Sequence, residues 1–147
     1  MLGGARSRDG GRVKVYVAAY SMELDRARFW MGKLRAAGHE IALDWTIQVE
    51  QARVADQPDW ALPIAERVKI AETDYLAAWG SDLVWTLLPQ YSGAGVHSEL
   101  GIGLASRNTT GPVRHVVCSG AWRRNVFSAL ADRVFDTDEA AFEFICG

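Results

Sequence analysis

The chain has 147 residues, of which 49% are hydrophobic and 23% are charged, and its formal net charge is −2. This length supports one domain with a substantial core and is too short for two ordinary domains. The weak acidity argues against a nucleic-acid-binding surface, which needs a clustered basic face. Two cysteines without a CxxC spacing and only three histidines indicate neither a disulfide framework nor a dedicated zinc site. We expect two reduced thiols in or near the core.

The start of the chain shows no targeting or membrane signal. Residues 1–12 are rich in glycine and arginine but lack the apolar run of a signal peptide. No segment approaches the roughly 20 apolar residues that a membrane-spanning helix needs. We therefore expect a flexible tail over residues 1–12, a single domain over residues 13–147, and a cytoplasmic protein without a membrane partner.

Short apolar runs alternate with helical patterns along the chain. The predicted strands cover residues 13–18, 40–43, 82–88, 113–118 and 133–135. The predicted helices cover residues 24–38, 63–79, 96–106, 123–130 and 137–145, and residues 46–59 are predicted as a loop and candidate lid. Strands that are nearly continuous apolar runs are expected when helices cover both faces of a sheet. The sequence therefore predicts an α/β fold with a doubly wound, Rossmann-like, five-stranded parallel sheet and helices on both faces.

The predicted helix over residues 63–79 carries a regular apolar stripe. Its members, at spacings of four, three, four and four residues, are Ile64, Val68, Ala71, Tyr75 and Trp79. This period places them on one side of the helix, which we expect to be buried. Asp74 flanks the stripe, so its carboxylate can point into a crevice rather than into the core.

The most informative segment runs from Ser92 to Gly101 and reads SGAGVHSELG. It follows a predicted strand and opens a predicted helix. At such junctions in an open parallel sheet, strand ends and helix N-termini form the ligand crevice, where free backbone N–H groups bind anions. We therefore expect Ser92, Gly93 and Gly95 to bind ligand, and Glu99 to act on a phosphate- or hydroxyl-rich molecule.

Four side chains are predicted to converge on this crevice: Tyr16, Asp74, Ser92 and Glu99. Two carboxylates have an obvious division of labour at a glycosidic carbon, because one can stabilise the anomeric centre while the other handles the leaving group. A tyrosine hydroxyl can orient the attacking carboxylate. Each residue also has a structural alternative, namely a core tyrosine, a solvated carboxylate, a turn serine and an acid at a helix start.

Three matches, in order along the chain, carry a resemblance to a known family. They are a Val-Tyr pair in the first strand, an Asp eight residues before the Asp of a strand start, and a Ser-x-Gly turn leading into Glu-Leu-Gly. They stand at Val15-Tyr16, at Asp74 with Asp82, and at Ser92–Gly95 with Glu99–Gly101. Over roughly residues 13–118 the sequence resembles the nucleoside 2-deoxyribosyltransferase superfamily, in particular its deoxynucleoside 5′-monophosphate N-glycosidase branch.

The resemblance implies a mechanism without metal or cofactor. Glu99 would be the nucleophile that forms a glycosyl-enzyme ester, discharged by water in a hydrolase or by another base in a transferase. Asp74 would contact or protonate the leaving base, and Tyr16 would position Glu99. Hydrolysis is favoured, because the C-terminal sequence does not show the Asn or Asp that transferases of this family usually carry there. The family also implies a homo-oligomer, most simply a dimer, for which Trp79, Tyr75 and Trp85 are candidate contacts.

The loop after the first strand departs from the family pattern. The glycosidases hold the 5′-phosphate with a glycine-rich loop, whereas this chain has AAYSME over residues 18–23. That loop offers the hydroxyl of Ser21 together with the repulsive carboxylate of Glu23. We therefore expect a free nucleoside to be processed at least as well as its 5′-monophosphate. His97 stands where the family often has a small residue and is a further candidate for ligand contact, with a surface position as the alternative.

Trp45 and Trp60 bracket the predicted lid and are candidates for stacking on a base, although tryptophans at such places more often cover core edges. The leading hypothesis is an N-glycosidase acting on a nucleoside or nucleotide. One alternative is a glycohydrolase of NAD type, which uses a single Glu on the same sheet topology. Another is a non-catalytic nucleotide-binding or sensing module that has kept the crevice.

Overall fold

The computed structural model describes residues 11–54, 61–91, 93–122 and 124–147, with only the backbone described for residues 53 and 54. Its centre is one sheet of five parallel strands in the order β2-β1-β3-β4-β5. The strands are β1 (Lys14–Ala18), β2 (Glu40–Ile41), β3 (Leu83–Leu87), β4 (His115–Ser119) and β5 (Arg133–Phe135). This topology confirms the predicted fold class.

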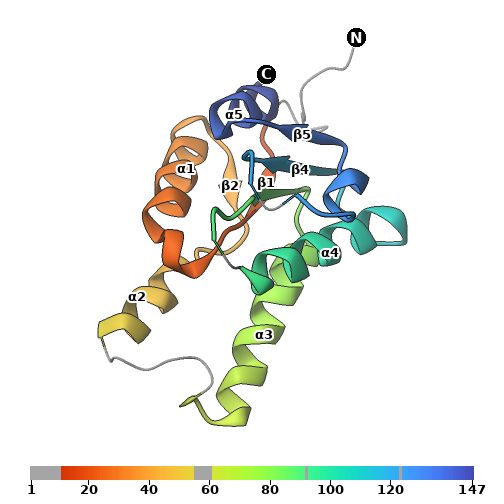
Figure 1. The fold of residues 1–147 in the computed structure, drawn as a ribbon. Helices are drawn as coiled ribbons and strands as arrows, with labels where there is room; N and C mark the ends of the chain where they lie inside the picture. Colours follow the sequence, from red (N-terminus) through yellow and green to blue (C-terminus); the bar gives the residue numbers. More distant parts are fainter. Residues whose placement is uncertain (1–10, 55–60, 92, 123) are drawn as a thin grey trace.

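Helices cover both faces of the sheet (Figure 1). They are α1 (Leu24–Ala36), α2 (Thr46–Val54), α3 (Ile64–Trp79), α4 (Ala94–Asn108) and α5 (Asp138–Cys146), with short 3-10 helices at η1 (Ser21–Glu23) and η3 (Ser128–Leu130). The helices α1 and α5 contact each other across one face, while α3 packs on α4 and α4 covers the other face. Such two-sided coverage explains why β3 is buried at all five positions.

Close packing of α4 on the sheet depends on a glycine. A Cβ at Gly103 would lie 2.9 Å from the Cγ2 atom of Val84 in β3, which is closer than side chains tolerate. On the opposite face, the ring of Trp30 in α1 lies 5.4 Å from that of Trp85 in β3. Trp85 is fully buried and donates its indole N–H to Ser119 Oγ at 2.9 Å. The expectation that Trp85 contributes to a subunit contact is therefore wrong, because none of its surface is accessible.

Residues 46–54 form the helix α2, so the predicted loop over residues 46–59 is wrong for its described part. The helix begins where the Asp44 carboxylate accepts a hydrogen bond from the backbone N–H of Thr46 at 3.2 Å. A short polar side chain that satisfies a free N–H group at a helix start stabilises that start. Among the described side chains of α2, Thr46 is buried while Ile47 is 57% exposed, so the apolar residues of this helix do not mark its buried side.

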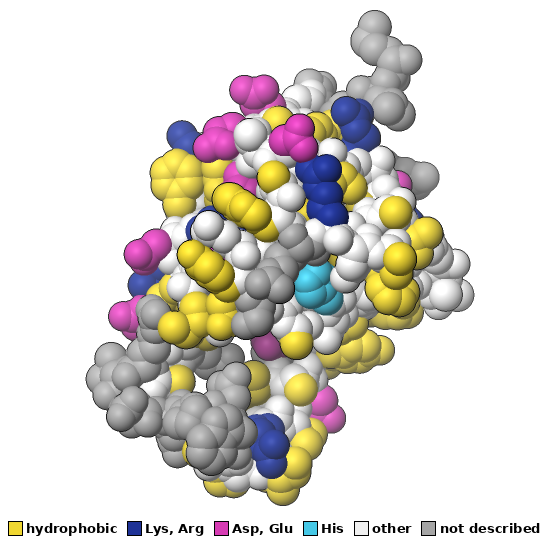
Figure 2. Space-filling model, viewed as in Figure 1, with side chains coloured by type: hydrophobic (Ala, Val, Ile, Leu, Met, Phe, Trp, Pro, Cys, Tyr) yellow, Lys and Arg dark blue, Asp and Glu magenta, His cyan; other side chains and the backbone are white. Residues whose placement is uncertain are grey.

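The predicted apolar stripe of α3 has the correct helical period but is not buried in the single chain. Ile64 is 66% exposed, Val68 is 47% exposed and Tyr75 is 45% exposed, and Ala78 is the one α3 residue described as buried. The reason is the position of the helix, whose first half extends beyond the sheet at the bottom of Figure 1. Hydrophobic side chains also reach the surface of this lower part of the molecule in Figure 2.

The predicted helix over residues 123–130 is reduced to the 3-10 helix η3 in the described residues 124–130. Asn125 explains the difference, because its side-chain oxygen accepts hydrogen bonds from the backbone N–H groups of Phe127 at 2.9 Å and Ser128 at 3.1 Å. A side chain that takes these donors offers the backbone an alternative to the helix. The second strand is also shorter than predicted and is limited to Glu40 and Ile41.

Candidate functional site

A cavity of about 390 Å³ lies at the carboxyl ends of the strands, where the neighbours β1 and β3 are not consecutive in sequence. Chain connections leave these two strands toward opposite faces, which opens a crevice at the switch point. The described lining residues come from the loop after β1, from α2, from α3 and from the start of α4. They are Ala19, Tyr20, Ser21, Trp45, Gln48, Val49, Ala52, Leu62, Ile70, Asp74, Gly93, Ala94, Gly95, Val96 and Glu99.

A hydrogen bond between Tyr16 and Glu99 lies at the base of this cavity. The hydroxyl of Tyr16, in β1, donates to Glu99 Oε1 at 3.0 Å. Glu99 lies in the second turn of α4 and lines the cavity, whereas Tyr16 is fully buried and reaches the cavity only through Glu99. The bond therefore fixes one carboxylate oxygen and leaves the other available to a ligand.

The surroundings of this pair change its protonation. Burial raises the pKa of Glu99 to about 8, while the hydrogen bond from Tyr16 opposes the rise and the charge of Asp74 adds to it. Burial, followed by the charges of Glu99 and Asp74, raises the pKa of Tyr16 far above its ordinary value. Tyr16 therefore remains a protonated donor, and Glu99 changes charge close to neutral pH.

Asp74 reaches the cavity from α3 and acts electrostatically on both members of the pair. Ile70, one turn earlier, lines the same cavity. The exposed stripe through Val68 and Tyr75 lies on a different side of the helix. The three residues predicted to be catalytic, Tyr16, Asp74 and Glu99, are thus brought together although they lie in three separate elements.

The predicted ligand-binding residues divide into three groups. Ser21, Trp45, Gly93 and Gly95 line the cavity. His97 is not among the lining residues, and its Nδ1 atom instead lies 3.2 Å from the side-chain nitrogen of Asn125. Ser92 and Trp60 lie outside the described residues.

Trp45 is held in a fixed orientation at the cavity wall. It is only 7% exposed, and its indole N–H donates to the carbonyl oxygen of Val17 at 2.8 Å. A ring anchored in this way presents a rigid apolar surface at little entropic cost on binding. The prediction from sequence missed its neighbours Gln48, Val49 and Ala52, because the segment that carries them was interpreted as a loop.

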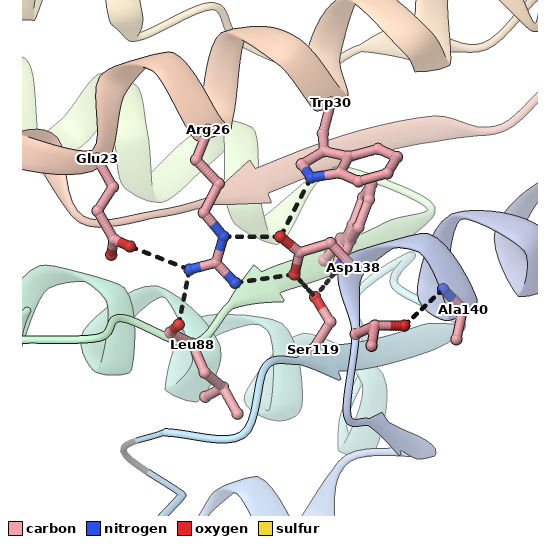
Figure 3. Close-up of polar contacts among 9 residues, drawn as sticks. Glu23, Arg26, Trp30, Leu88, Ser119, Asp138 and Ala140 are labelled. Atoms are coloured by element: carbon pink, nitrogen blue, oxygen red, sulfur yellow. Dashed lines mark hydrogen bonds and ion pairs between the residues drawn. The ribbon is translucent and has the colours of Figure 1, made fainter.

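The Glu23 carboxylate does not face the cavity as the sequence suggested. Its Oε1 atom pairs with the guanidinium of Arg26 at 3.3 Å, and Glu23 is absent from the described lining. Figure 3 shows Glu23 directed toward Arg26. Its neighbour Ser21, by contrast, lines the cavity.

The described lining contains two carboxylates and no lysine, arginine or histidine. Such a surface favours a neutral or cationic ligand and repels an anionic one. Within the described part of the chain, no three His, Cys, Asp or Glu side chains gather as a potential metal site. Nor does any helix described there combine the length and apolarity needed to cross a membrane.

Comparisons of the chain with protein-family models, with curated proteins and with solved structures gave no significant match.

The pH titration of the Glu99 carboxyl group tests whether its pKa is raised by burial. In protein labelled at the glutamate carboxyl carbon, NMR is expected to show a midpoint near pH 8. Tyr16→Phe removes a donor that favours the carboxylate, so the midpoint should rise. Asp74→Asn removes a like charge, so the midpoint should fall, each shift being on the order of one pH unit.

Glu99→Gln identifies the resonance by its disappearance. Tyr75→Phe removes a hydroxyl from the exposed side of α3 and should leave the midpoint unchanged. A midpoint in wild-type protein near the ordinary value of 4.5 would contradict the desolvated placement of Glu99.

Proposed function

We propose that the protein hydrolyses the N-glycosidic bond of a nucleoside, with Glu99 as the nucleophile. The observation that carries the proposal is the 3.0 Å hydrogen bond from Tyr16 to Glu99 in a switch-point cavity that Asp74 also lines. The cavity volume of about 390 Å³ lies within the range of small-molecule sites. The resemblance to the nucleoside 2-deoxyribosyltransferase superfamily in the sequence supports the same chemistry.

In the proposed reaction, the ionised Glu99 attacks the anomeric carbon of the sugar while the bond to the base nitrogen breaks. The bonding electron pair leaves with the base, and Asp74 contacts the base. A proton from solvent water, taken up by the base directly or passed on by the Asp74 carboxylate, makes the base a better leaving group. The Tyr16 hydroxyl keeps the attacking carboxylate in place. Water then cleaves the glycosyl ester, releasing the free sugar and returning Glu99 as a carboxylic acid or carboxylate.

Glu99→Gln is expected to reduce the rate of base release by at least about 10³-fold, because an amide cannot form the ester. The assay incubates the protein with a panel of nucleosides, their 5′-monophosphates and NAD, and follows free base by chromatography. For the active substrate, kcat/KM should rise with pH around a midpoint near 8, since the nucleophile must be ionised.

Glu72→Gln, on an exposed part of α3, provides the control for loss of a carboxylate. A Glu99→Gln variant that retains the wild-type rate would remove Glu99 as the nucleophile. Release of base from NAD alone would favour the glycohydrolase alternative, and nucleoside binding without release of base would indicate a non-catalytic module.

The charge of the cavity predicts selectivity at the 5′ end of the substrate. Phosphate recognition needs several fixed donors, and a cavity with Asp74 and Glu99 but no described cationic side chain opposes a dianion. We expect kcat/KM for the free nucleoside to equal or exceed that for its 5′-monophosphate. A preference for the monophosphate of more than about tenfold, or roughly 1.4 kcal/mol of transition-state binding, would contradict this prediction.

We also propose that a second copy of the chain covers the apolar stripe of α3. The stripe has continuous helical periodicity, yet Ile64, Val68 and Tyr75 are each at least 45% exposed. In a two-fold dimer the same surface on both copies meets itself, so one such stripe suffices for both sides of the contact. The pairing would place the stripe against the partner, while the side of α3 that carries Ile70 and Asp74 still faces the cavity.

Light scattering at micromolar concentration is expected to give the mass of a dimer. Val68→Glu places a charge in the centre of the stripe and should shift the protein toward monomer, whereas Thr73→Glu, off the stripe, should not. A monomeric mass for the wild-type protein would refute the proposed pairing.

A further inference from the structure

The guanidinium group of Arg26, in α1, joins three segments at the carboxyl edge of the sheet (Figure 3). Its Nε and Nη2 atoms donate to the two carboxylate oxygens of Asp138 at 2.7 and 2.8 Å. Its Nη1 atom donates to the carbonyl oxygen of Leu88 at 2.7 Å and to Glu23 Oε1 at 3.3 Å. Glu23 follows β1, Leu88 follows β3, and Asp138 begins α5 after β5. One side chain therefore connects the segments that follow three strands of the sheet.

The Asp138 carboxylate is saturated with donors. Besides the two bonds from Arg26, it accepts one from the indole N–H of Trp30 at 3.2 Å and one from the hydroxyl of Ser119 at 2.6 Å. Burial acts to raise the pKa of Asp138, but the bonds from Arg26 and Ser119 outweigh it and the pKa is lowered. The side chains of Arg26 and Asp138 are only 17% and 15% exposed. A buried ion pair of this kind contributes little net stability compared with apolar packing. Its main effect is therefore on the relative placement of the segments that it joins.

The segment after Leu88 leads directly to the candidate site. Pro89 follows Leu88, and Gly93 packs so tightly on Pro89 that a Cβ there would lie 2.9 Å from the proline Cγ and 3.5 Å from the Cβ of Tyr20. The Gly93 carbonyl accepts the first hydrogen bond of α4, from the N–H of Val96 at 3.1 Å. Glu99 lies one turn further along. The carbonyl that Arg26 holds therefore lies next to Pro89, which packs directly on Gly93 at the start of the helix that carries Glu99.

We propose that Arg26 is a positioning residue that sets the placement of Glu99 against Tyr16 by holding the Leu88 carbonyl and, through Glu23, the loop that carries Ser21. Lysine cannot take this role, because a single ammonium group cannot bind both oxygens of Asp138 and the Leu88 carbonyl in the fork geometry of a guanidinium. The kinetic consequence rests on the proposed function, whereas the placement of Glu99 does not.

Arg107 provides a matched control. Its side chain is also 17% exposed, pairs with Asp132 at 2.8 Å and donates to the Leu130 carbonyl at 2.8 Å. Asp132 immediately precedes β5, so this ion pair lies at the amino edge of the sheet, away from the cavity. Arg107 lies near the C-terminal end of α4, the helix that carries Glu99. Arg107→Gln therefore removes a carboxylate contact and a carbonyl contact from the far end of the same helix, without touching Leu88, Glu23 or any residue of the described cavity lining.

The experiment is a double-mutant cycle read by the carboxyl resonance of Glu99. Tyr16→Phe is introduced into the wild type, into Arg26→Gln and into Arg107→Gln, and the change in the Glu99 titration midpoint is measured in each. If Arg26 holds Glu99 on Tyr16, the change should fall to less than half of its wild-type size in Arg26→Gln and stay the same in Arg107→Gln. An undiminished change in Arg26→Gln would overturn the proposal.

If Arg26→Gln does not fold, Arg26→Lys takes its place in the cycle. A shift of the Glu99 midpoint by Tyr16→Phe that is as large in Arg26→Lys as in the wild type equally overturns the proposal.

Where a nucleoside substrate has been found, Arg26→Gln should lower kcat by about 10- to 100-fold with KM changed less than threefold, because misplacement of a reacting group affects the chemical step. A protein that hydrolyses no nucleoside would refute the proposed function and leave the result of the cycle standing.

Discussion

A buried carboxyl group requires a hydrogen-bond donor, and Tyr16 supplies one to Glu99 across the switch point of the sheet. The two residues are 83 positions apart in the chain. Only the parallel pairing of β1 with β3 and the packing of α4 on both strands brings them together. The close contact of Gly103 with Val84 sets the distance of α4 from the sheet. The site therefore depends on the placement of α4, and the pair is disrupted by any change that moves this helix.

Two sides of the helix α3 have different surroundings. One side carries Ile70 and Asp74 to the cavity, and another carries the exposed apolar stripe. Its C-terminal half is held by α4, while the first half extends from the body (Figure 1). A helix held at one end gains stability when a partner covers its apolar side, since burial of such side chains is favourable. Assembly on this stripe would therefore also stiffen the wall that carries Asp74.

Sequence patterns predicted the central elements well, because β1, β3 and α1 are defined by apolar periods that depend on local burial alone. They predicted α2 poorly, because the buried Thr46 is polar, the apolar Ile47 is exposed, and the signal for the helix start lay in the polar Asp44 that precedes it. The stripe of α3 shows a further limit. A period identifies which residues share a side but does not identify what covers that side.

Some features had no local signal at all. Arg26, Ser119 and Asp138 lie in different elements, and the residues around each of them in the sequence do not point to the other two. Their common site follows from the parallel topology, which gathers the carboxyl ends of the strands at one edge. Glu23 differs, because its partner Arg26 stands only three residues later, and this spacing is a local signal for an ion pair on one helical side. Prediction from sequence thus identified Asp74, Glu99 and their partner Tyr16, but not the cluster around Arg26 that we propose to position Glu99.

The raised pKa of Glu99 has a consequence for how the proposed reaction gains its rate. In the free protein, burial and the charge of Asp74 make ionisation of Glu99 costly. As the bond to the base breaks, the sugar acquires the positive charge of an oxocarbenium ion directly beside this carboxylate. The same low-polarity surroundings that oppose a lone carboxylate strengthen its attraction to that charge. The interaction is thus weak before the reaction and strong in the transition state, and only such a difference accelerates a chemical step.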